Sequence, residues 1–278
     1  MGAAVVAPDV TPTSPVGHAP FTSDRLARVV GAPTYDRCMS DRAARPTAHE
    51  VLAAVLQIRD GTLQVLAWRR AQPPDAGRWA LPGGLLGDDE DVEASVRRQL
   101  AEKVDVREIS HVEQLAVFSA PHRVPGARRI ATAFLGLVPS DADPVVPTDI
   151  TWHPVDAVPD PAFDHVEIVR AARDRLRAKL SYTNLGFALA PREFTISMLR
   201  EHYAAALGHP VSATNLQRVL ARRAVLVPTG ELVAPGPAGG RPAALFRFAE
   251  RTLRVTDAFA VLRPPGRPPG EHARAALP

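Results

Sequence analysis

The chain has 278 residues, 46% of them hydrophobic, which is enough for two compact domains with a buried core. Its formal net charge of +3 is uneven. Residues 181–278 hold twelve arginines, no lysine and six carboxylates, so that part carries +6 and residues 1–180 carry −3. A single cysteine, Cys38, excludes an intramolecular disulfide and a cysteine-based zinc cluster. Only the basic C-terminal part therefore suits a polyanionic partner.

The two ends of the chain have the composition of unstructured segments. Residues 1–47 mix proline, alanine, threonine and aspartate without a sustained hydrophobic period, and we expect a disordered tail. Residues 251–278 form a Pro-rich extension whose end we also expect to be disordered. The N-terminus lacks the basic and long apolar regions of a secretion signal, and no apolar stretch reaches membrane-spanning length. We therefore expect a cytoplasmic protein with no membrane partner.

Residues 48–180 combine strand and helix patterns. Apolar runs predict strands over 51–58 and 63–68, joined by a tight turn at Asp60-Gly61. Apolar residues recur every fourth position in a helix from about 91 to 104, at Val92, Val96, Leu100 and Val104. Three further strands and a second helix are expected at 112–118, 129–138, 150–152 and 166–180. Strands on both sides of one helix, closed by another, favour an α/β fold.

A glycine and several charged residues recur at fixed spacing in LPGGLLGDDEDVEASVRRQLAEKVDV, residues 81–106. The spaced positions are Gly84, Glu90, Arg98, Gln99, Leu100, Glu102, Lys103, Asp105 and Val106. This pattern resembles the signature of the Nudix hydrolases, in which Gly, five residues, Glu and seven residues precede Arg-Glu-apolar-x-Glu-Glu-x-Gly-apolar. Gln99 and Lys103 stand where that family has glutamate, and Asp105 where it has glycine. The resemblance implies a Nudix-type α/β/α sandwich with a degenerate box.

The substitutions at Gln99 and Lys103 bear on metal binding. In the Nudix family the glutamates of this helix collect divalent cations beside a diphosphate, because Mg²⁺ prefers carboxylate and phosphate oxygens. Gln99, Glu102 and Lys103 together carry no net charge, and an ammonium about 4 Å from a metal opposes its binding by several kcal/mol. We therefore predict that the box binds a nucleotide diphosphate without efficient hydrolysis. Glu102 is then the only weak, residual metal ligand, and Mg²⁺ or Mn²⁺ matters only for residual activity.

The predicted effector-binding set combines residues of the box with two that precede it: Arg69, Arg70, Gly83, Gly84 and Lys103. The Lys103 ammonium is expected to meet the diphosphate at the vacated metal position; the alternative is that Gln99 and Lys103 face solvent. Arg69 and Arg70 have the alternative of a solvated pair after a strand. Glu90 and Arg98 are expected to hold the loop to the helix. His122 and His165 are interpreted as surface or core histidines rather than catalytic ones.

Residues 181–250 change in character. Phe194, Ile196, Leu199, Tyr203 and Leu207 form an apolar stripe that predicts a helix capped by Thr195. Gly208-His209-Pro210 ends it, and Ser212 is placed to cap a second helix with Leu216, Val219 and Leu220 facing inward. Strands are expected at 225–227 and 243–248, around a turn-rich stretch from 228 to 242. Helix, turn, helix and two strands predict a winged helix-turn-helix domain.

The second of these helices has the residues that a DNA-reading helix needs. Asn215, Arg218 and Arg222 are three and four positions apart, so they share one outward face. Arginine and asparagine read base edges in the major groove through paired hydrogen bonds. The predicted DNA-binding set is Ser212, Thr214, Asn215, Gln217, Arg218, Arg222 and, at the wing tip, Arg241, with Arg223 flanking the face. The alternative is a solvated polar face beside a basic loop.

Three C-terminal stretches carry a more specific resemblance: SYTNLGFALAPREFTISMLREHYAAALGHP, NLQRVL and GGRPAALFRF. With the upstream box they resemble the NrtR family of Nudix-related transcriptional regulators of NAD metabolism, over about 49–249. The resemblance implies a homodimer, a palindromic operator in double-stranded DNA near NAD biosynthesis or salvage genes, and ADP-ribose as effector. The hypothesis is thus an ADP-ribose-responsive repressor. The alternatives are an active ADP-ribose pyrophosphatase-like hydrolase with an accessory DNA-binding domain, and a protein-interaction adaptor that does not bind DNA.

Overall fold

The computed structural model describes residues 47–104, 109–144, 146–234 and 241–257, without the side chains of residues 103 and 104. The expected disordered segments at 1–47 and at the end of 251–278 therefore lie almost wholly outside the described residues, as do the side chains of Lys103 and Val104. In the described ranges no helix is long and apolar enough to cross a membrane.

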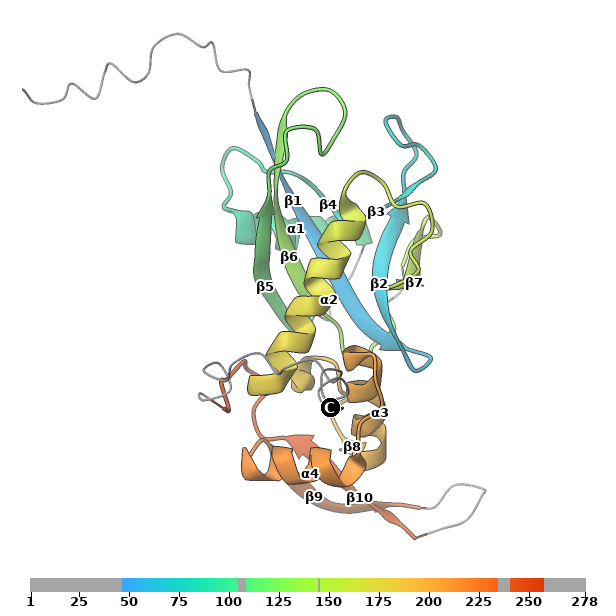
Figure 1. Cartoon of the computed structure of the whole chain (residues 1–278), viewed down its shortest axis with the longest axis vertical. Coiled ribbons are helices and arrows are strands. Elements are labelled where there is room, and N and C mark those ends of the chain that lie inside the picture. The colour runs from blue at the N-terminus through green and yellow to red at the C-terminus, as the bar shows by residue number, and fades with distance from the viewer. Residues whose placement is uncertain (1–46, 105–108, 145, 235–240, 258–278) are drawn as a thin grey trace, which may run out of the picture. The chain divides into compact units, whose positions relative to one another are not determined.

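The first part of the chain forms a mixed sheet (Figure 1). Its strands are β1 (Ala48–Arg59), β2 (Thr62–Arg69), β3 (Trp79–Ala80), β4 (Gly83–Leu85), β5 (His111–Phe118), β6 (Arg129–Leu137) and β7 (Ile150–Pro154). The order is β3-β2-β1-β6-β5, with β4 paired to β1 and β7 to β2. β1 runs parallel to β6 and antiparallel to β2, where Leu56 faces Val65. The predicted turn is present, with φ of 48° at Asp60 and 71° at Gly61.

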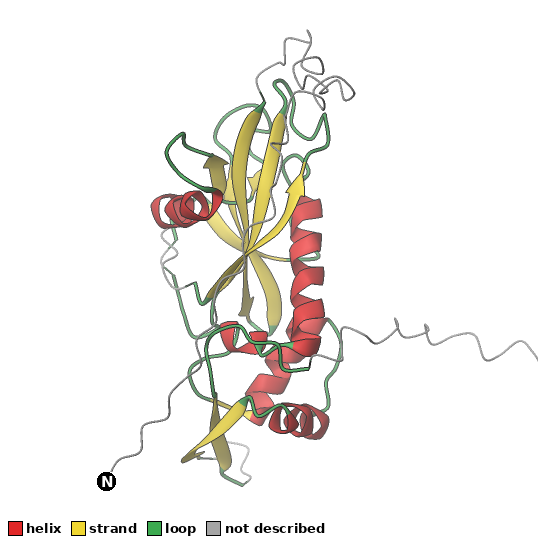
Figure 2. Ribbon diagram, turned by 90° about the vertical axis from the view of Figure 1, so that its left-hand side faces the viewer, coloured by secondary structure: helices red, strands yellow, loops and turns green. Residues whose placement is uncertain are grey.

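A helix covers each face of this sheet (Figure 2). They are α1 (Val92–Val104) and α2 (His165–Tyr182). β1 is apolar at consecutive positions because both of its faces are buried: Val51 and Val55 pack with Val96 and Leu100 of α1. Its other face packs with α2 in a second cluster. This is the expected α/β/α sandwich, called the α/β domain below.

The C-terminal domain is a winged helix-turn-helix. It contains η2 (Leu185–Ala188), β8 (Phe194–Thr195), α3 (Ile196–Leu207), α4 (Ala213–Arg222), β9 (Leu226–Val233) and β10 (Ala243–Phe248). Thr195 and Ser212 cap α3 and α4 as predicted, by accepting bonds from the N–H groups of Met198 and Asn215. Two boundaries were wrong: Phe194 belongs to β8, which pairs with β10, and β9 continues through the expected turn to Val233.

One hydrophobic cluster runs through both domains. It joins Leu56 and Ile58 of β1 to Leu199 and Tyr203 of α3 and continues to Phe248 of β10. Gly186 in η2 makes this packing possible, because a Cβ there would lie 2.5 Å from the Tyr203 hydroxyl oxygen. Because close-packed cores transmit strain, a shift of α2 would displace side chains of the helix-turn-helix that pack in the same cluster.

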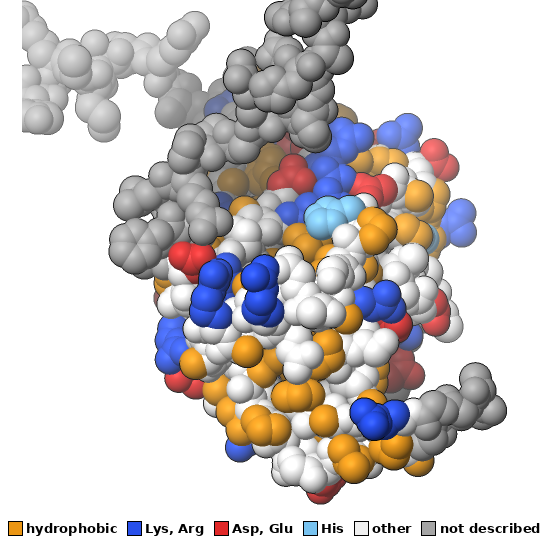
Figure 3. Space-filling model, turned by 60° about the horizontal axis from the view of Figure 1, so that its bottom comes forward, with side chains coloured by type: hydrophobic (Ala, Val, Ile, Leu, Met, Phe, Trp, Pro, Cys, Tyr) orange, Lys and Arg blue, Asp and Glu red, His pale blue; other side chains and the backbone are white. Residues whose placement is uncertain are grey.

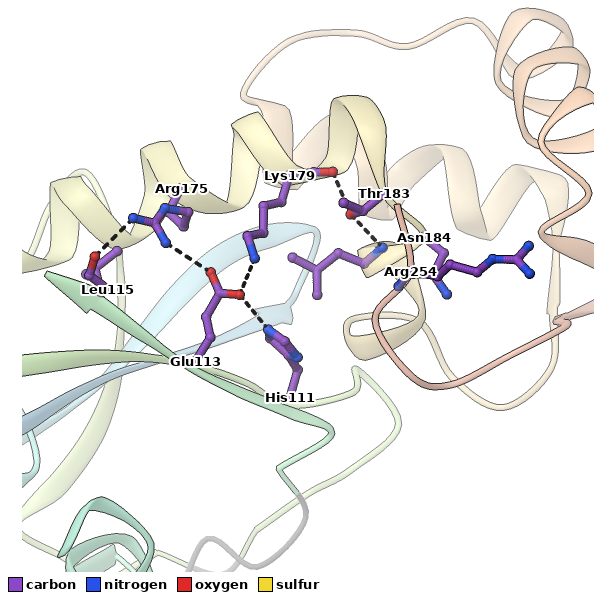
Figure 4. A network of polar contacts seen from close by, with 9 residues as sticks. His111, Glu113, Leu115, Arg175, Lys179, Thr183, Asn184 and Arg254 are labelled. Atoms are coloured by element: carbon purple, nitrogen blue, oxygen red, sulfur yellow. Dashed lines mark hydrogen bonds and ion pairs between the residues drawn. The ribbon is translucent and has the colours of Figure 1, made fainter. Parts of the chain in front are cut away.

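A polar network lies beside this core, where β5 faces the last turns of α2 (Figure 4). The Glu113 carboxylate accepts hydrogen bonds from Lys179, from His111 at 3.0 Å and from Arg175 at 3.4 Å. Its side chain is 14% exposed. His111 also meets the ring of Phe187 edge-on, with 6.5 Å between centroids. The network therefore ties the edge of the sheet to α2 and to η2.

Candidate functional site

Glu90 and Arg98 join the box loop to the helix. Arg98 donates from Nε to Glu90 Oε2 at 2.9 Å and from Nη2 to Oε1 at 2.5 Å, and the Gly87 N–H donates to Glu90 Oε1 at 2.8 Å. These bonds, those of Arg98 above all, lower the pKa of Glu90 to about 2. The same bonds raise the pKa of Arg98. Both side chains are thus engaged with each other, as expected for a structural role.

The side chains of Gln99 and Glu102, two of the three glutamate positions of the box, do not converge. Gln99 is 4% exposed, so the alternative that it faces solvent is wrong. Its Nε2 donates to the Leu85 carbonyl at 3.4 Å, and its Oε1 has no partner in the described part of the chain. Glu102 is exposed and pairs with Arg98 at 3.2 Å. An amide turned to a carbonyl and one ion-paired carboxylate do not fit a dication, and the described ranges contain no cluster of three metal-ligating side chains.

A pocket opens beside the glycines of the box. Two adjoining cavities, of about 250 and 470 Å³, share the side chains of Trp68, Arg70, Arg129 and Phe163. The Arg70 guanidinium lies 4.8 Å from the ring centroid of Phe163 and 5.7 Å from that of Trp68. The Arg70 Nε also donates to the Pro74 carbonyl at 3.0 Å and its Nη2 to the Gln72 carbonyl at 3.5 Å, so the stacked guanidinium is held in place and has Nη1 left for a ligand. The pocket thus offers two arginines and two aromatic rings.

Gly83 and Gly84 line the smaller cavity. Gly83 has a φ of 155° and pairs with Leu52 of β1, so close that a Cβ would overlap the Val51 carbonyl oxygen. Only glycine fits at this position. The two glycines therefore bring backbone, rather than side chain, to the wall of the pocket.

Buried charges form the base of the pocket. Arg123 is 1% exposed and pairs with Glu50 of β1 and, through two bonds of 2.7 and 2.8 Å, with Asp164 ahead of α2. Arg129 meets the other Glu50 oxygen at 3.5 Å. Burial opposes ionisation of Arg123, but the two carboxylates raise its pKa above the ordinary value. This network joins β1, the β5–β6 loop and the start of α2 around the ligand space.

His165 is a core residue, as interpreted from the sequence. Its Nδ1 accepts a hydrogen bond from the Leu81 N–H at 2.9 Å, which fixes the strand before the glycines. Burial, with help from the positive charges of Arg123 and Arg70, lowers the pKa of His165 to about 3. The ring is therefore neutral at physiological pH. His122 is exposed, as expected of a surface histidine.

The structure separates the two adjacent arginines. Arg70 enters the pocket, whereas Arg69 is exposed and donates to the Gly77 carbonyl at 3.2 Å. Sequence reasoning missed Trp68, Phe163, Arg129, Glu50 and Arg123. Glu50 gave one signal, since it is a carboxylate directly before the apolar run of β1 from Val51 to Leu56. Trp68 and Arg129 lie in the predicted strands β2 and β6, but strand pattern alone does not show which side chains line a pocket. Arg123 and Phe163 lie in loops whose folding no local pattern reveals.

The predicted DNA-binding residues are all solvent-exposed. Ser212, Thr214, Asn215, Gln217, Arg218 and Arg222 are all exposed on α4 or at its cap, and Arg241 is exposed before β10. Arg218 donates to Asn215 at 2.9 Å. Arg223 differs: it bonds the Ser181 carbonyl at 2.5 Å and pairs with Asp257. On this end of the molecule basic side chains lie over a largely neutral surface, with most acidic ones toward the rim (Figure 3).

The fold and its pocket define a Nudix-fold protein with a winged helix DNA-binding domain. Residues 48–172 match the NUDIX domain family and residues 186–248 the NrtR DNA-binding winged helix domain. The chain is 30% identical over 203 residues, 70% of its own length and 80% of the relative's, to the ADPR responsive transcriptional repressor NtrR of Acinetobacter baylyi. The chain belongs to the NrtR family of Nudix-related transcriptional regulators.

Solved structures agree with this assignment. NrtR of Shewanella oneidensis complexed with a 27mer DNA is 29% identical, with a TM-score of 0.61 over 72% of this chain and 92% of that one. A MutT/nudix family protein from Enterococcus faecalis is 22% identical with a TM-score of 0.61 over 74% of this chain and 90% of that one. The second likeness concerns the fold alone.

Proposed function

We propose that the chain is a repressor that binds double-stranded DNA and responds to ADP-ribose. The observation that carries the proposal is a cationic pocket on a degenerate box, joined by a continuous core to a helix-turn-helix with an exposed basic face. The Acinetobacter relative is named as an ADPR-responsive repressor. We propose further that the protein acts in the cytoplasm, with residues 48–180 as the effector domain and 181–250 as the DNA-binding domain.

The pocket suits a nucleoside diphosphate. Arg70 and Arg129 offer N–H groups to phosphate oxygens, and a guanidinium binds phosphate in bidentate fashion. Gly83 and Gly84 allow the ligand to approach backbone. Trp68 and Phe163 supply flat apolar faces for a base or a ribose. In this proposal Lys103 adds an ammonium from α1, while Arg69 contributes through the loop that it fastens at Gly77.

We propose further that ADP-ribose is held without efficient hydrolysis. Catalysis in this fold needs a metal to stabilise charge on the diphosphate. Gln99 carries no charge and Glu102 is paired with Arg98, so these two side chains are weak ligands for a metal. The test is incubation of pure protein with ADP-ribose and Mg²⁺ or Mn²⁺. Slow or absent release of AMP is expected; release at an ordinary enzymatic rate of about 1–10³ per second would favour the hydrolase alternative.

On the DNA side we propose a homodimer that binds a palindromic operator upstream of NAD biosynthesis or salvage genes. Two-fold operators place half-sites about one helical turn apart, so a modest movement between two α4 helices breaks the register. In this proposal α2 carries the movement, because it begins at His165 beside the pocket and its second half is bonded to β5 through Glu113. A coupling of about 1–3 kcal/mol would change operator affinity roughly 5- to 150-fold.

The deciding experiment is a gel shift with upstream DNA of NAD genes, titrated with ADP-ribose, NAD and AMP. Binding in the absence of ligand, released specifically by ADP-ribose, is the expected result. Binding unaffected by any of the three would leave a DNA-binding protein with another effector. No binding to any such DNA would favour the adaptor alternative.

A further inference from the structure

A cleft lies where the α/β domain meets the C-terminal domain. Its volume is about 450 Å³, and it shares no lining residue with the pocket around Arg70. One wall comes from the start of β5 and the loop after β6, at Ser110, Pro139 and Asp141. The other comes from Arg192 before β8 and Arg251 after β10. A space of this size holds a small metabolite.

The loop that forms the first wall is held in place by a side chain of β1. The Gln57 side chain, fully buried in β1, donates to the carbonyl oxygens of Pro139 at 2.7 Å and Ala142 at 2.6 Å. A buried amide whose two donors are satisfied by one loop holds that loop in a single conformation. This wall is thus built before any ligand arrives.

The second wall is tied to the first by hydrogen bonds between the domains. The Ser140 N–H donates to the Leu189 carbonyl at 2.9 Å, and the Ser140 hydroxyl bonds the His202 ring at 2.6 Å. The Arg192 N–H donates to an Asp141 carboxylate oxygen at 3.3 Å. The cleft is therefore a contact between two domains that leaves a hollow beside it.

Positive charge in this cleft is not matched by negative charge. Over the described residues neither guanidinium forms an ion pair: Arg251 donates only to the Pro191 carbonyl at 3.5 Å, and the Arg192 side chain has no partner. Asp141 is the one carboxylate among the lining residues. Burial lowers the pKa of Arg251, the negative charge of Asp141 raises it, and the positive charge of Arg192 has a smaller lowering effect. The lining therefore holds two guanidinium groups and one carboxylate, which leaves one positive charge without a counter-charge among the lining residues.

We propose that this cleft binds a phosphate monoester, which makes it a second ligand site distinct from the effector pocket. A dianion between Arg192 and Arg251 balances the excess positive charge of the lining and accepts charge-assisted bonds from both guanidinium groups. Pro139 and Ile109 leave apolar surface for a sugar or a base next to the phosphate. Because the ligand touches both domains at once, its binding stabilises their present arrangement and hence the position of α4.

The test is calorimetric titration of the full chain with inorganic phosphate, ribose 5-phosphate and AMP. We expect binding that is at least about tenfold weaker in Arg192→Ala/Arg251→Ala, which removes two charged hydrogen-bonding groups. Monoester affinity should be unchanged in the control variant Arg97→Ala/Arg170→Ala, which removes the same charge from exposed helix positions. Asp141→Asn should tighten binding, because it removes the only carboxylate of the lining while keeping an acceptor for the Arg192 N–H.

Arg70→Ala separates this proposal from the proposed function. Monoester binding that survives Arg70→Ala but not the Arg192/Arg251 substitutions supports the cleft, whether or not ADP-ribose is the effector. Binding lost in Arg70→Ala and kept in the cleft variant, or no binding to wild type at millimolar ligand, overturns it. Equal binding of all three probes assigns the site to free phosphate, and preference for AMP assigns it to a nucleotide. The proposal would also be overturned if the cleft variant changed its oligomeric state but not its affinity for the monoester, because the cleft would then be an interface between copies of the chain.

Discussion

The carboxylate of Glu90 and the guanidinium of Arg98 lie face to face, eight residues apart, with 2.9 Å between Nε and Oε2 and 2.5 Å between Nη2 and Oε1. Glu90 also accepts the Gly87 N–H. The pair therefore clamps the loop of residues 86–91 to the second turn of α1. Glu90 and Arg98 match the Nudix pattern and make a structural contact, whereas Gln99 and Lys103 replace the glutamates of that pattern.

Glu90→Gln should lower the melting temperature at pH 7. The folded-state pKa of Glu90 is about 2, below its ordinary 4.5. A depressed pKa stabilises the folded chain above pH 4.5, and this contribution is lost as the pH falls toward 2. Thermal unfolding of both proteins from pH 7 to pH 3 should show the difference shrinking with acid. Glu93→Gln, at an exposed pair with Arg97, is the matched control; an equal effect there would contradict the clamp.

Gln99→Glu with Lys103→Glu should restore metal binding. Without metal, the new carboxylate at position 99 is nearly buried against the Leu85 carbonyl oxygen, which costs about 1–3 kcal/mol of stability. Mn²⁺ would bridge the carboxylates and reverse that loss. The measurement is the melting temperature of each protein with and without Mn²⁺, plus calorimetry. A double variant that neither loses stability nor gains metal affinity would show that these positions do not form the site.

Arg123→Met should be strongly destabilising. It leaves Glu50 and Asp164 buried without their shared cation, and loss of one member of a buried ion pair costs about 3–5 kcal/mol. Adding Glu50→Gln and Asp164→Asn removes the uncompensated charges, so the triple variant should regain part of that stability. Urea denaturation at pH 7 measures both effects. If the single and triple variants were equally destabilised, packing rather than charge would explain the loss.

Local pattern predicted most of the elements but only part of the pocket. Periodicity placed α1, α2 and the longer strands, because each must bury an apolar face, but not the short strands β3 and β4. Cap residues such as Ser212 marked helix starts. Phe194 was misplaced because a two-residue strand has no period of its own. Arg70 and Arg69 are adjacent and chemically identical, and only the course of β2 sends one into the pocket. Arg123 and Phe163 reach the site through tertiary contacts that sequence spacing does not encode.

Arg218→Ala should weaken operator binding by about 1–3 kcal/mol, or roughly 5- to 150-fold, if α4 reads the major groove. In the free protein Arg218 bonds only Asn215 on the same face, so stability should hardly change. Arg170→Ala removes one exposed positive charge from α2 and should leave DNA binding nearly intact. Fluorescence anisotropy with operator DNA at fixed salt compares the three proteins. Wild-type affinity in Arg218→Ala would show that α4 is not the recognition helix.

Glu113→Gln should reduce the coupling between effector and DNA more than either binding event. Glu113 joins β5 to α2 through Lys179 and Arg175, and its neutral amide cannot hold both cations (Figure 4). Although burial alone would raise the pKa of Glu113, bonds from His111 and Lys179 lower it to about 2. The carboxylate is therefore charged throughout the physiological range.

The measurement is operator affinity with and without saturating ADP-ribose. The expected ratio is several-fold smaller than in wild type, consistent with the 1–3 kcal/mol or so of a typical allosteric coupling. Glu167→Gln, an exposed carboxylate in the first turn of α2, should keep the wild-type ratio; an unchanged ratio in both variants would exclude this network from the coupling path.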